Sequence, residues 1–241
     1  MKIAIMQPTF NPWLGYIYMI QSVDTFVFLD NVQFERRSWQ NRNKIKLQDK
    51  TFLLGLNLQK ASQKTSLQDI LFEKDNKWKI KFLKTIHHAY SKSINFDKYY
   101  NILEKNLFKH THLVQFNMKL IRIYCEHLNI KTPILQSSSL NLKNKKKEKL
   151  LLEICQILKA DYYLSPEGSK NYLEKDTAKE IFKNANIKIE YFDFIHPTYT
   201  QLGTNFIAYL GILDFLFNEK EPYTKFQECV KINECNNESS F

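Results

Sequence analysis

The chain has 241 residues, 44% of them hydrophobic, which is enough to bury the core of one α/β domain. With only 5 glycines and 6 prolines, a β-sandwich rich in tight turns is not expected. The formal net charge of +10 suits a nucleic acid, an anionic membrane surface or an acidic small ligand, and by itself it does not choose among them.

The start of the chain predicts a β-α-β unit. An apolar run over residues 3–6 ends at Gln7, and apolar residues then recur at helical spacing over residues 13–20. A second apolar run, 26–29, closes at Asp30 and has the pattern of a strand covered on both faces of a parallel sheet. Because ligands of such sheets bind beyond the carboxyl ends of the strands, we expect loops 7–11 and 30–33 to converge on a ligand crevice.

Residues 34–44, here called the cassette, combine four cations with amides and a tryptophan. The guanidinium groups of Arg37 and Arg42 match phosphate or carboxylate, and Trp39 offers a stacking face. The cassette therefore favours an anionic ligand that contains a ring. A solvated basic loop with Trp39 in the core is the alternative, and the residue types leave it open.

The rest of the chain alternates between strand and helix patterns. We predict a hairpin from 44–47 and 51–58, and a helical insertion at about 66–130 with helices at 76–91, 96–108 and 113–128. Strands are predicted at 133–136, 162–165 and 187–194, and helices at 147–159, 176–185 and 205–217. Together these elements predict a single α/β domain over 1–235, with a mostly parallel sheet, helices on both faces, and a disordered tail at 236–241.

Two further polar clusters follow predicted strands. Glu167 and Lys170 stand where a strand turns into a helix, a junction that can hold an anion or simply cap the helix. His196, Tyr199 and Gln201 follow the strand at 187–194. His196 is the candidate general base, because its ordinary pKa lies near neutrality, and Tyr199 could orient it or the substrate; a structural role for His196 stays open.

Asp214 lies on an otherwise apolar helical stretch, so it needs a partner if it is buried. An ion pair with Arg37 or Arg42, or a cap for a neighbouring loop, would supply that partner.

Several long strings, MQPTFNPWLGYIYMI, FVFLDNVQFERRSWQNRNKIK, IHPTYTQ and LGILDFLFN, occur in this order along nearly the whole chain. On these strings the chain resembles the WbqC-like protein family. That family is associated with clusters for O-antigen, lipopolysaccharide and other surface-polysaccharide biosynthesis, so the resemblance implies a role in making a surface glycan. The opening strand, loop and helix also look like the start of HIGH-type nucleotidyltransferases, and this likeness implies a Rossmann-like nucleotide-binding fold. Adenylyl transfer is not expected, because no histidine precedes His87 here.

The leading hypothesis is a transferase that modifies a nucleotide-activated or otherwise anionic sugar precursor, with an acyl or aminoacyl group as one candidate donor. The sequence identifies no cofactor and no metal site. His196, Asp30 and Tyr199 form the predicted catalytic set. The predicted ligand-binding set is Gln7, Asn11, Arg37, Trp39, Asn41, Arg42, Lys44, Glu167, Lys170 and Gln201.

A non-enzymatic nucleic-acid-binding or scaffold protein is the alternative. The sequence pI of 9.2 and the mixture of cations and tryptophan in the cassette favour it. Against it, the chain carries no RNP, KH or helix-turn-helix signature, and the cations do not form one extended stripe. We therefore expect a small anionic partner, a nucleotide sugar above all, rather than nucleic acid.

The expected location is the cytoplasm. No signal peptide and no apolar run of membrane-spanning length is visible in the sequence, and the four cysteines show no CxxC spacing. These features predict free thiols in a reducing compartment.

Overall fold

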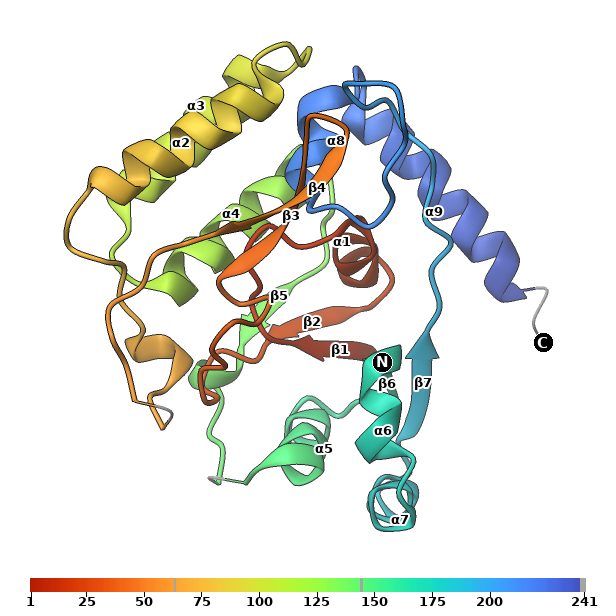
Figure 1. Ribbon diagram of the computed structural model, residues 1–241. Coiled ribbons are helices and arrows are strands. Elements are labelled where there is room, and N and C mark those ends of the chain that lie inside the picture. The colour runs from red at the N-terminus through yellow and green to blue at the C-terminus, as the bar shows by residue number, and fades with distance from the viewer. Residues whose placement is uncertain (63, 144, 239–241) are drawn as a thin grey trace. The chain divides into compact units, whose positions relative to one another are not determined.

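The computed structural model describes residues 1–62, 64–143 and 145–238 (Figure 1). The chain divides into two compact units. Unit 1 comprises Met1–Gln7, Tyr18–Asn31 and Lys131–Phe194, and unit 2 comprises Pro8–Ile17, Val32–Ile130 and Ile195–Phe241. The assignment of 1–235 to one domain with an insertion stays a prediction.

A parallel sheet forms the centre of unit 1. Its strands are β1 (Lys2–Met6), β2 (Thr25–Phe28), β5 (Ile134–Gln136), β6 (Tyr162–Pro166) and β7 (Lys188–Phe192). They lie in the order β5-β2-β1-β6-β7, and every neighbouring pair is parallel. In chain order this is third, second, first, fourth, fifth, which is the strand order of Rossmann-like folds. The predicted fold class is therefore confirmed.

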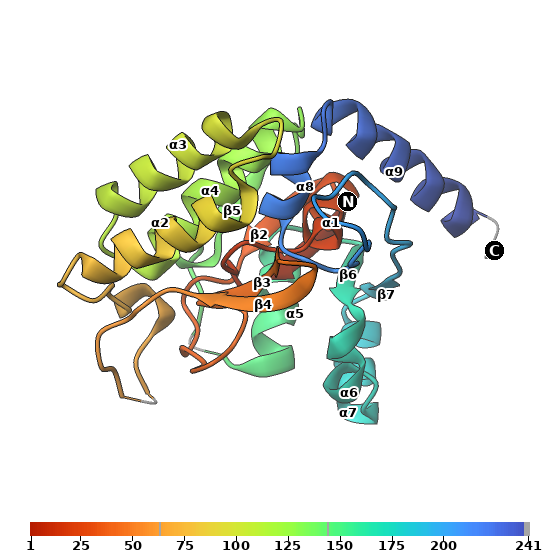
Figure 2. The same ribbon diagram turned by 45° about the horizontal axis from the view of Figure 1, so that its top comes forward.

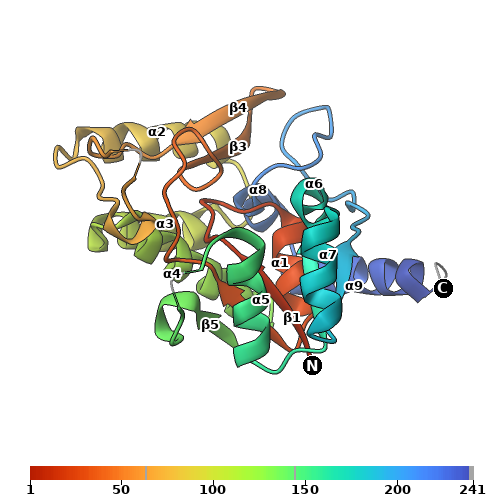
Figure 3. The same cartoon turned by 90° about the horizontal axis from the view of Figure 1, so that it is seen from below.

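Helices cover both faces of this sheet. They are the second half of α1 (Leu14–Gln21), α5 (Lys147–Ile157), α6 (Lys170–Leu173) and α7 (Asp176–Asn184). The ring of Phe182 on α7 stacks on Tyr163 of β6 at 5.9 Å, whereas Tyr18 on α1 packs on Phe192 of β7 at 5.7 Å. Phe192 is in register with Pro166, three residues beyond Tyr163, so the two contacts lie on opposite faces. Figure 3 shows α5 and α7 side by side.

The central strands are apolar because both of their faces are covered. Ile3 and Ala4 of β1, and Phe26, Val27 and Phe28 of β2, have no exposed surface. This burial explains why the sequence shows continuous apolar runs here instead of an alternation of apolar and polar residues.

Unit 2 contains the predicted hairpin, formed by β3 (Arg42–Leu47) and β4 (Lys50–Gly55) in antiparallel register. The turn residues Gln48 and Asp49 have φ values of 49° and 57°. Two successive left-handed residues are typical of the type I′ turn, whose twist matches that of a two-stranded ribbon.

The helices of unit 2 are α2 (Lys77–Tyr90), α3 (Phe96–Lys109), α4 (Leu113–His127), α8 (Ile212–Asn218) and α9 (Pro222–Glu238). The first three confirm the predicted helical stretch, and α2 and α3 run side by side in Figure 2. On α2, Trp78, Phe82, Ile86 and Tyr90 are buried at a spacing of four residues. Tyr90 at the end of this face stacks on Phe217 of α8, with ring centroids 4.8 Å apart.

The helix predicted over 205–217 is wrong in its first half, because α8 begins only at Ile212. Tertiary hydrogen bonds occupy the backbone of the preceding loop. The side chain of Gln201 bonds both the N–H and the C=O of Ile207, and the N–H of Tyr209, whose φ is 58°, donates to His196. These groups are no longer available for helical bonds.

Helix α9 was not predicted and extends three residues into the segment 236–241 that was expected to be a disordered tail. Residues 239–241 lie outside the described residues. In the part of the chain that is described, no helix combines the length and the apolar character needed to cross a membrane.

Candidate functional site

Four predicted site residues lie at the carboxyl edge of the sheet in unit 1. Gln7 follows β1, Asp30 follows β2, and Glu167 and Lys170 follow β6. The strands β2 and β5 lie on one side of β1, and β6 and β7 lie on the other. The strand order thus switches between β1 and β6, and ligands of open α/β sheets bind at such a switch point. The ligand crevice expected at this edge for Gln7 and Asp30 stays a prediction.

Asp30 at this edge already has its carboxylate occupied. Its Oδ1 accepts hydrogen bonds from the Ser137 hydroxyl (2.8 Å) and the Ser138 N–H (2.9 Å), and its Oδ2 accepts from the Ser138 hydroxyl (2.6 Å). Asp30 is almost fully buried. It thus ties the end of β2 to the 3-10 turn after β5 (Ser137–Ser139), a structural use that the sequence did not indicate. Glu167 and Lys170, both exposed, form an ion pair at 3.1 Å.

The cassette belongs to unit 2, and its charged residues lie at the surface. Trp39 is 52% exposed, so the alternative that placed it in the core is wrong. Arg37 is also exposed, and the Arg42 guanidinium donates to the Arg37 carbonyl. The side-chain oxygen of Asn41 is buried and accepts no hydrogen bond from the described residues.

Strand β3 extends the cassette into a row of cations. Arg42, Lys44 and Lys46 alternate along β3 and therefore share one face of the hairpin, whereas Asn43 and Ile45 are buried on the other face. At about 3.3 Å per residue, the row spans about 13 Å. We call Arg42, Lys44 and Lys46 the cationic row.

A buried carboxylate lies beyond the last residue of this row. Asp214 on α8 has no exposed surface. Its Oδ1 accepts from the Tyr90 hydroxyl at 2.8 Å, and its Oδ2 accepts from the Tyr199 hydroxyl at 2.9 Å and the Gln201 amide at 2.8 Å. Burial raises the pKa of Asp214 to about 6, and the three donors limit the rise. The expected ion pair with Arg37 or Arg42 is not formed, whereas Tyr199 and Gln201 do come from a neighbouring loop.

Asp214 lines a cavity of about 340 Å³ in unit 2. The other lining residues include Lys46, Gln48, Asp49, His88, Tyr90, Lys92 and Gly203. Lys46 is buried and pairs with Asp49 at 3.0 Å. A cavity with convergent polar groups and a carboxyl group of perturbed pKa is a typical candidate active site. Sequence reasoning missed Lys46, although its alternation with Arg42 and Lys44 was visible, and it had no signal for Tyr90.

His196 is half-buried beside this network, and both of its ring nitrogens are engaged. Nε2 accepts from the Tyr209 N–H at 3.1 Å, so the proton lies on Nδ1, which donates to the Pro197 carbonyl at 2.9 Å. Burial lowers the pKa of His196 and favours this neutral form. In this arrangement the hydroxyl of Tyr199 is bonded to Asp214, not to the imidazole.

Asn11, predicted to bind ligand, instead caps α8. Its Oδ1 accepts from the Leu213 N–H at 3.0 Å, while the N–H groups of Gly211 and Ile212 donate to the carbonyls of Lys44 and Pro12. All three amides at the start of α8 are thereby satisfied by the opening loop and β3. Residues of three of the long sequence strings, around Asn11, Lys44 and Asp214, thus belong to one hydrogen-bonded unit.

Asn117 supports the same loop from α4, and we expect Asn117→Ala to lower the free energy of unfolding by about 2–3 kcal/mol. Its amide donates to the buried carbonyls of Pro8 (3.0 Å) and Gln40 (2.8 Å), both of which would lose a partner. Asn101→Ala, at an exposed position of α3, is the control and should be neutral or slightly stabilising. Urea denaturation followed by circular dichroism measures both, and equal values for the two variants would contradict the prediction.

The Rossmann-like order of unit 1 and the cationic row and buried carboxylate of unit 2 define an α/β protein with a candidate site for an anionic ligand. The model of the WbqC-like protein family matches residues 7–225, and the chain belongs to this family. The uncharacterized protein Rv1507c of Mycobacterium tuberculosis (strain ATCC 25618 / H37Rv) is 28% identical over 221 residues, which cover 90% of this chain and 93% of that protein. No solved structure matches the chain.

Proposed function

We propose that this protein is a cytoplasmic transferase of surface-glycan biosynthesis that modifies a nucleotide-activated or otherwise anionic sugar precursor. The observation that carries the proposal is the buried Asp214 carboxylate, with a pKa of about 6, in a cavity that also contains Lys46, the last cation of the row. The surface-polysaccharide clusters with which the family is associated supply the biological context. Buried thiols at Cys125, Cys155 and Cys229 suit a reducing compartment.

In this proposal Asp214 is the final proton acceptor. Because its carboxylate has no exposed surface, Tyr90, which lines the same cavity and donates to it, passes the proton on. At neutral pH a carboxyl group with this pKa is mostly ionised, so it can take the proton of an acceptor hydroxyl or amine. The acceptor oxygen or nitrogen bonds to the carbonyl carbon of an acyl or aminoacyl donor, the bond between that carbon and its leaving group breaks, and the proton ends on Asp214. Tyr90, Tyr199 and Gln201 hold the carboxylate in place.

Arg42 and Lys44, the two cations of the row that are not buried, would bind the phosphates of the precursor, and Trp39 would stack on its base or sugar ring. At about 3.3 Å per residue these two positions lie about 7 Å apart, which suits a diphosphate. Arg37 and Asn41 border Arg42 within the cassette and belong to the same proposed subsite. Roles for Gln7, Asp30, Glu167 and Lys170 at the sheet edge of unit 1 stay predictions.

The proposal is tested by Lys44→Gln. We expect this change to weaken the binding of a nucleoside diphosphate sugar about tenfold, because one charge-assisted contact to phosphate is lost. Lys50→Gln is the matched control: it removes the same charge from the same hairpin, but Lys50 pairs with Leu47 and lies on the opposite face from Lys44. Isothermal titration of uridine, thymidine, guanosine and cytidine diphosphate sugars measures the effect. Equal affinities for both variants would refute the phosphate role of the row.

A nucleic-acid-binding role is the second candidate, favoured by the exposure of Trp39 among the cassette cations. The two functions differ in their response to salt. Affinity for a short RNA should fall steeply and uniformly as salt rises, whereas a sugar-nucleotide site keeps its selectivity. Binding to RNA alone, abolished by moderate salt, would replace the transferase proposal.

A further inference from the structure

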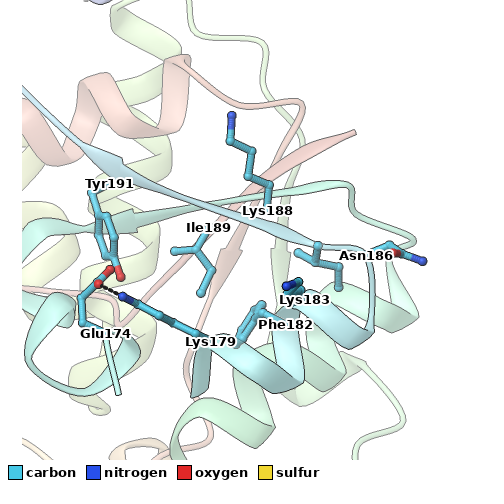
Figure 4. Close-up of a pocket in the computed structure, with 9 residues that line it drawn as sticks. Glu174, Lys179, Phe182, Lys183, Asn186, Lys188, Ile189 and Tyr191 are labelled. Carbon is cyan, nitrogen blue, oxygen red and sulfur yellow. Dashed lines mark ion pairs between the residues drawn. The ribbon is translucent and has the colours of Figure 1, made fainter. Parts of the chain in front are cut away.

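Unit 1 contains a second cavity, of about 480 Å³, between α7 and the edge strand β7 (Figure 4). This volume lies within the range of roughly 300–1,000 Å³ that is usual for small-molecule sites. Its lining residues are Glu174, Lys179, Phe182, Lys183, Asn186, Ile187, Lys188, Ile189 and Tyr191. None of them belongs to the Asp214 site or to the predicted site residues.

The inner surface of this cavity is apolar. Phe182 of α7 and Ile187 are buried, and Ile189 and Tyr191 alternate on β7 so that both face α7. Because β7 is the edge of the sheet, no further strand follows it there in the described residues, and this part of the β7 face stays open. An apolar group of a ligand could occupy it.

Among the lysines that line the cavity, Lys183 is the one placed to bind a ligand. Lys179 forms an ion pair with Glu174, and the Tyr191 hydroxyl points toward the same carboxylate. Lys188 points away from α7, and its ammonium lies 5.8 Å from the centre of the Tyr162 ring. Lys183, one turn beyond Lys179, lines the cavity and pairs with no carboxylate of the described residues.

We propose that this cavity binds a small organic anion with an apolar body, with its carboxylate or phosphate group on Lys183 and its apolar part against Phe182, Ile187 and Ile189. The ligand is expected to be anionic at one end, because Lys183 is not neutralised by a carboxylate in the described part of the chain, whereas Lys179 is paired with Glu174. It is expected to be apolar at the other end, because the surface between α7 and β7 is apolar. This site shares no residue with the Asp214 cavity, whose lining residues all belong to unit 2.

The experiment is isothermal titration of the full chain with three probes: octanoate, butanoate and inorganic phosphate. We expect octanoate to bind, and butanoate to bind more weakly by roughly tenfold or more, because less apolar surface is buried. Inorganic phosphate should bind more weakly than octanoate for the same reason. Octyl phosphate, compared with octanoate, then distinguishes a phosphate ester from a carboxylate as the anionic group.

Lys183→Gln should weaken octanoate binding about tenfold. Lys175→Gln is the matched control, since Lys175 is an exposed lysine at the start of α7 that does not line the cavity. Equal octanoate affinities for the two variants, or equal affinities for octanoate and butanoate, would overturn the proposal. So would the absence of octanoate binding to the wild-type chain, and none of these results bears on the Lys44 experiment.

Discussion

Gly211→Ala is expected to destabilise the protein by about 3–4 kcal/mol, with a fall in Tm of about 6–16 °C. A Cβ at this position would lie 2.0 Å from Asn11 Nδ2, 2.3 Å from Asn11 Cγ and 2.6 Å from the Asn11 carbonyl oxygen. The Asn11 side chain cannot simply rotate away, because its Oδ1 caps α8 through the Leu213 N–H. The substitution therefore adds overpacking to the loss of a helix cap.

Gly55→Ala is the control for this prediction, since it adds the same methyl group within unit 2. There the new Cβ would meet Arg42 Cβ at 3.5 Å and the Asn41 carbonyl at 3.8 Å, which is ordinary van der Waals contact. We expect a change within about 0.5 kcal/mol. Thermal denaturation of both variants measures the difference, and a Gly211→Ala protein as stable as Gly55→Ala would contradict the capping arrangement.

The second large effect concerns Asp214 and pH. Burial raises the folded-state pKa of Asp214 to about 6, from the ordinary carboxyl value of 3.8. A carboxyl group with a raised pKa favours folding below its unfolded pKa, and that contribution is lost as pH rises through the folded pKa. Full ionisation thus costs about 3 kcal/mol of stability by pH 8.

Comparison with Asp214→Asn isolates this contribution, because asparagine does not titrate. From about pH 8 to pH 5 the wild-type chain should gain about 1.4 kcal/mol of stability relative to the variant. Urea denaturation at several pH values measures this gain. In Tyr199→Phe the gain should begin at higher pH, because a hydrogen bond that lowers the pKa of Asp214 is removed. Parallel pH profiles for wild type and Asp214→Asn would show that the carboxyl group is not perturbed.

The same variants address catalysis. If Asp214 receives the proton of the substrate hydroxyl or amine, Asp214→Asn should abolish transfer even where the protein is fully folded. Tyr199→Phe should shift the pH profile of kcat to higher pH. A His196→Ala protein tests the base predicted from sequence. If His196→Ala loses all activity while Asp214→Asn stays active, His196 and not Asp214 is the general base.

Local patterns were sufficient for most elements of the fold. The continuous apolar runs of β1 and β2 predicted buried parallel strands because burial on both faces selects such runs. The spacing of Trp78, Phe82 and Ile86 predicted α2, because a helix that buries one face carries an apolar residue at every third or fourth position. The helix predicted from 205 failed because long-range bonds from Gln201 and His196 occupied backbone groups whose local pattern was helical.

The sequence by itself determined the α/β class with a parallel sheet, the hairpin and the polar character of the strand ends, since these depend on periodicity and residue type. It also indicated the family and the Rossmann-like fold, through the resemblance of long strings of residues. Only the tertiary structure decided which partners these polar residues have. Asn11 Oδ1 and the carboxylates of Asp30 and Asp214 all accept long-range hydrogen bonds, and the Tyr90 donor to Asp214 is 124 residues away along the chain. Partners at such separations leave no periodic signal, because they are brought together by packing and not by local geometry.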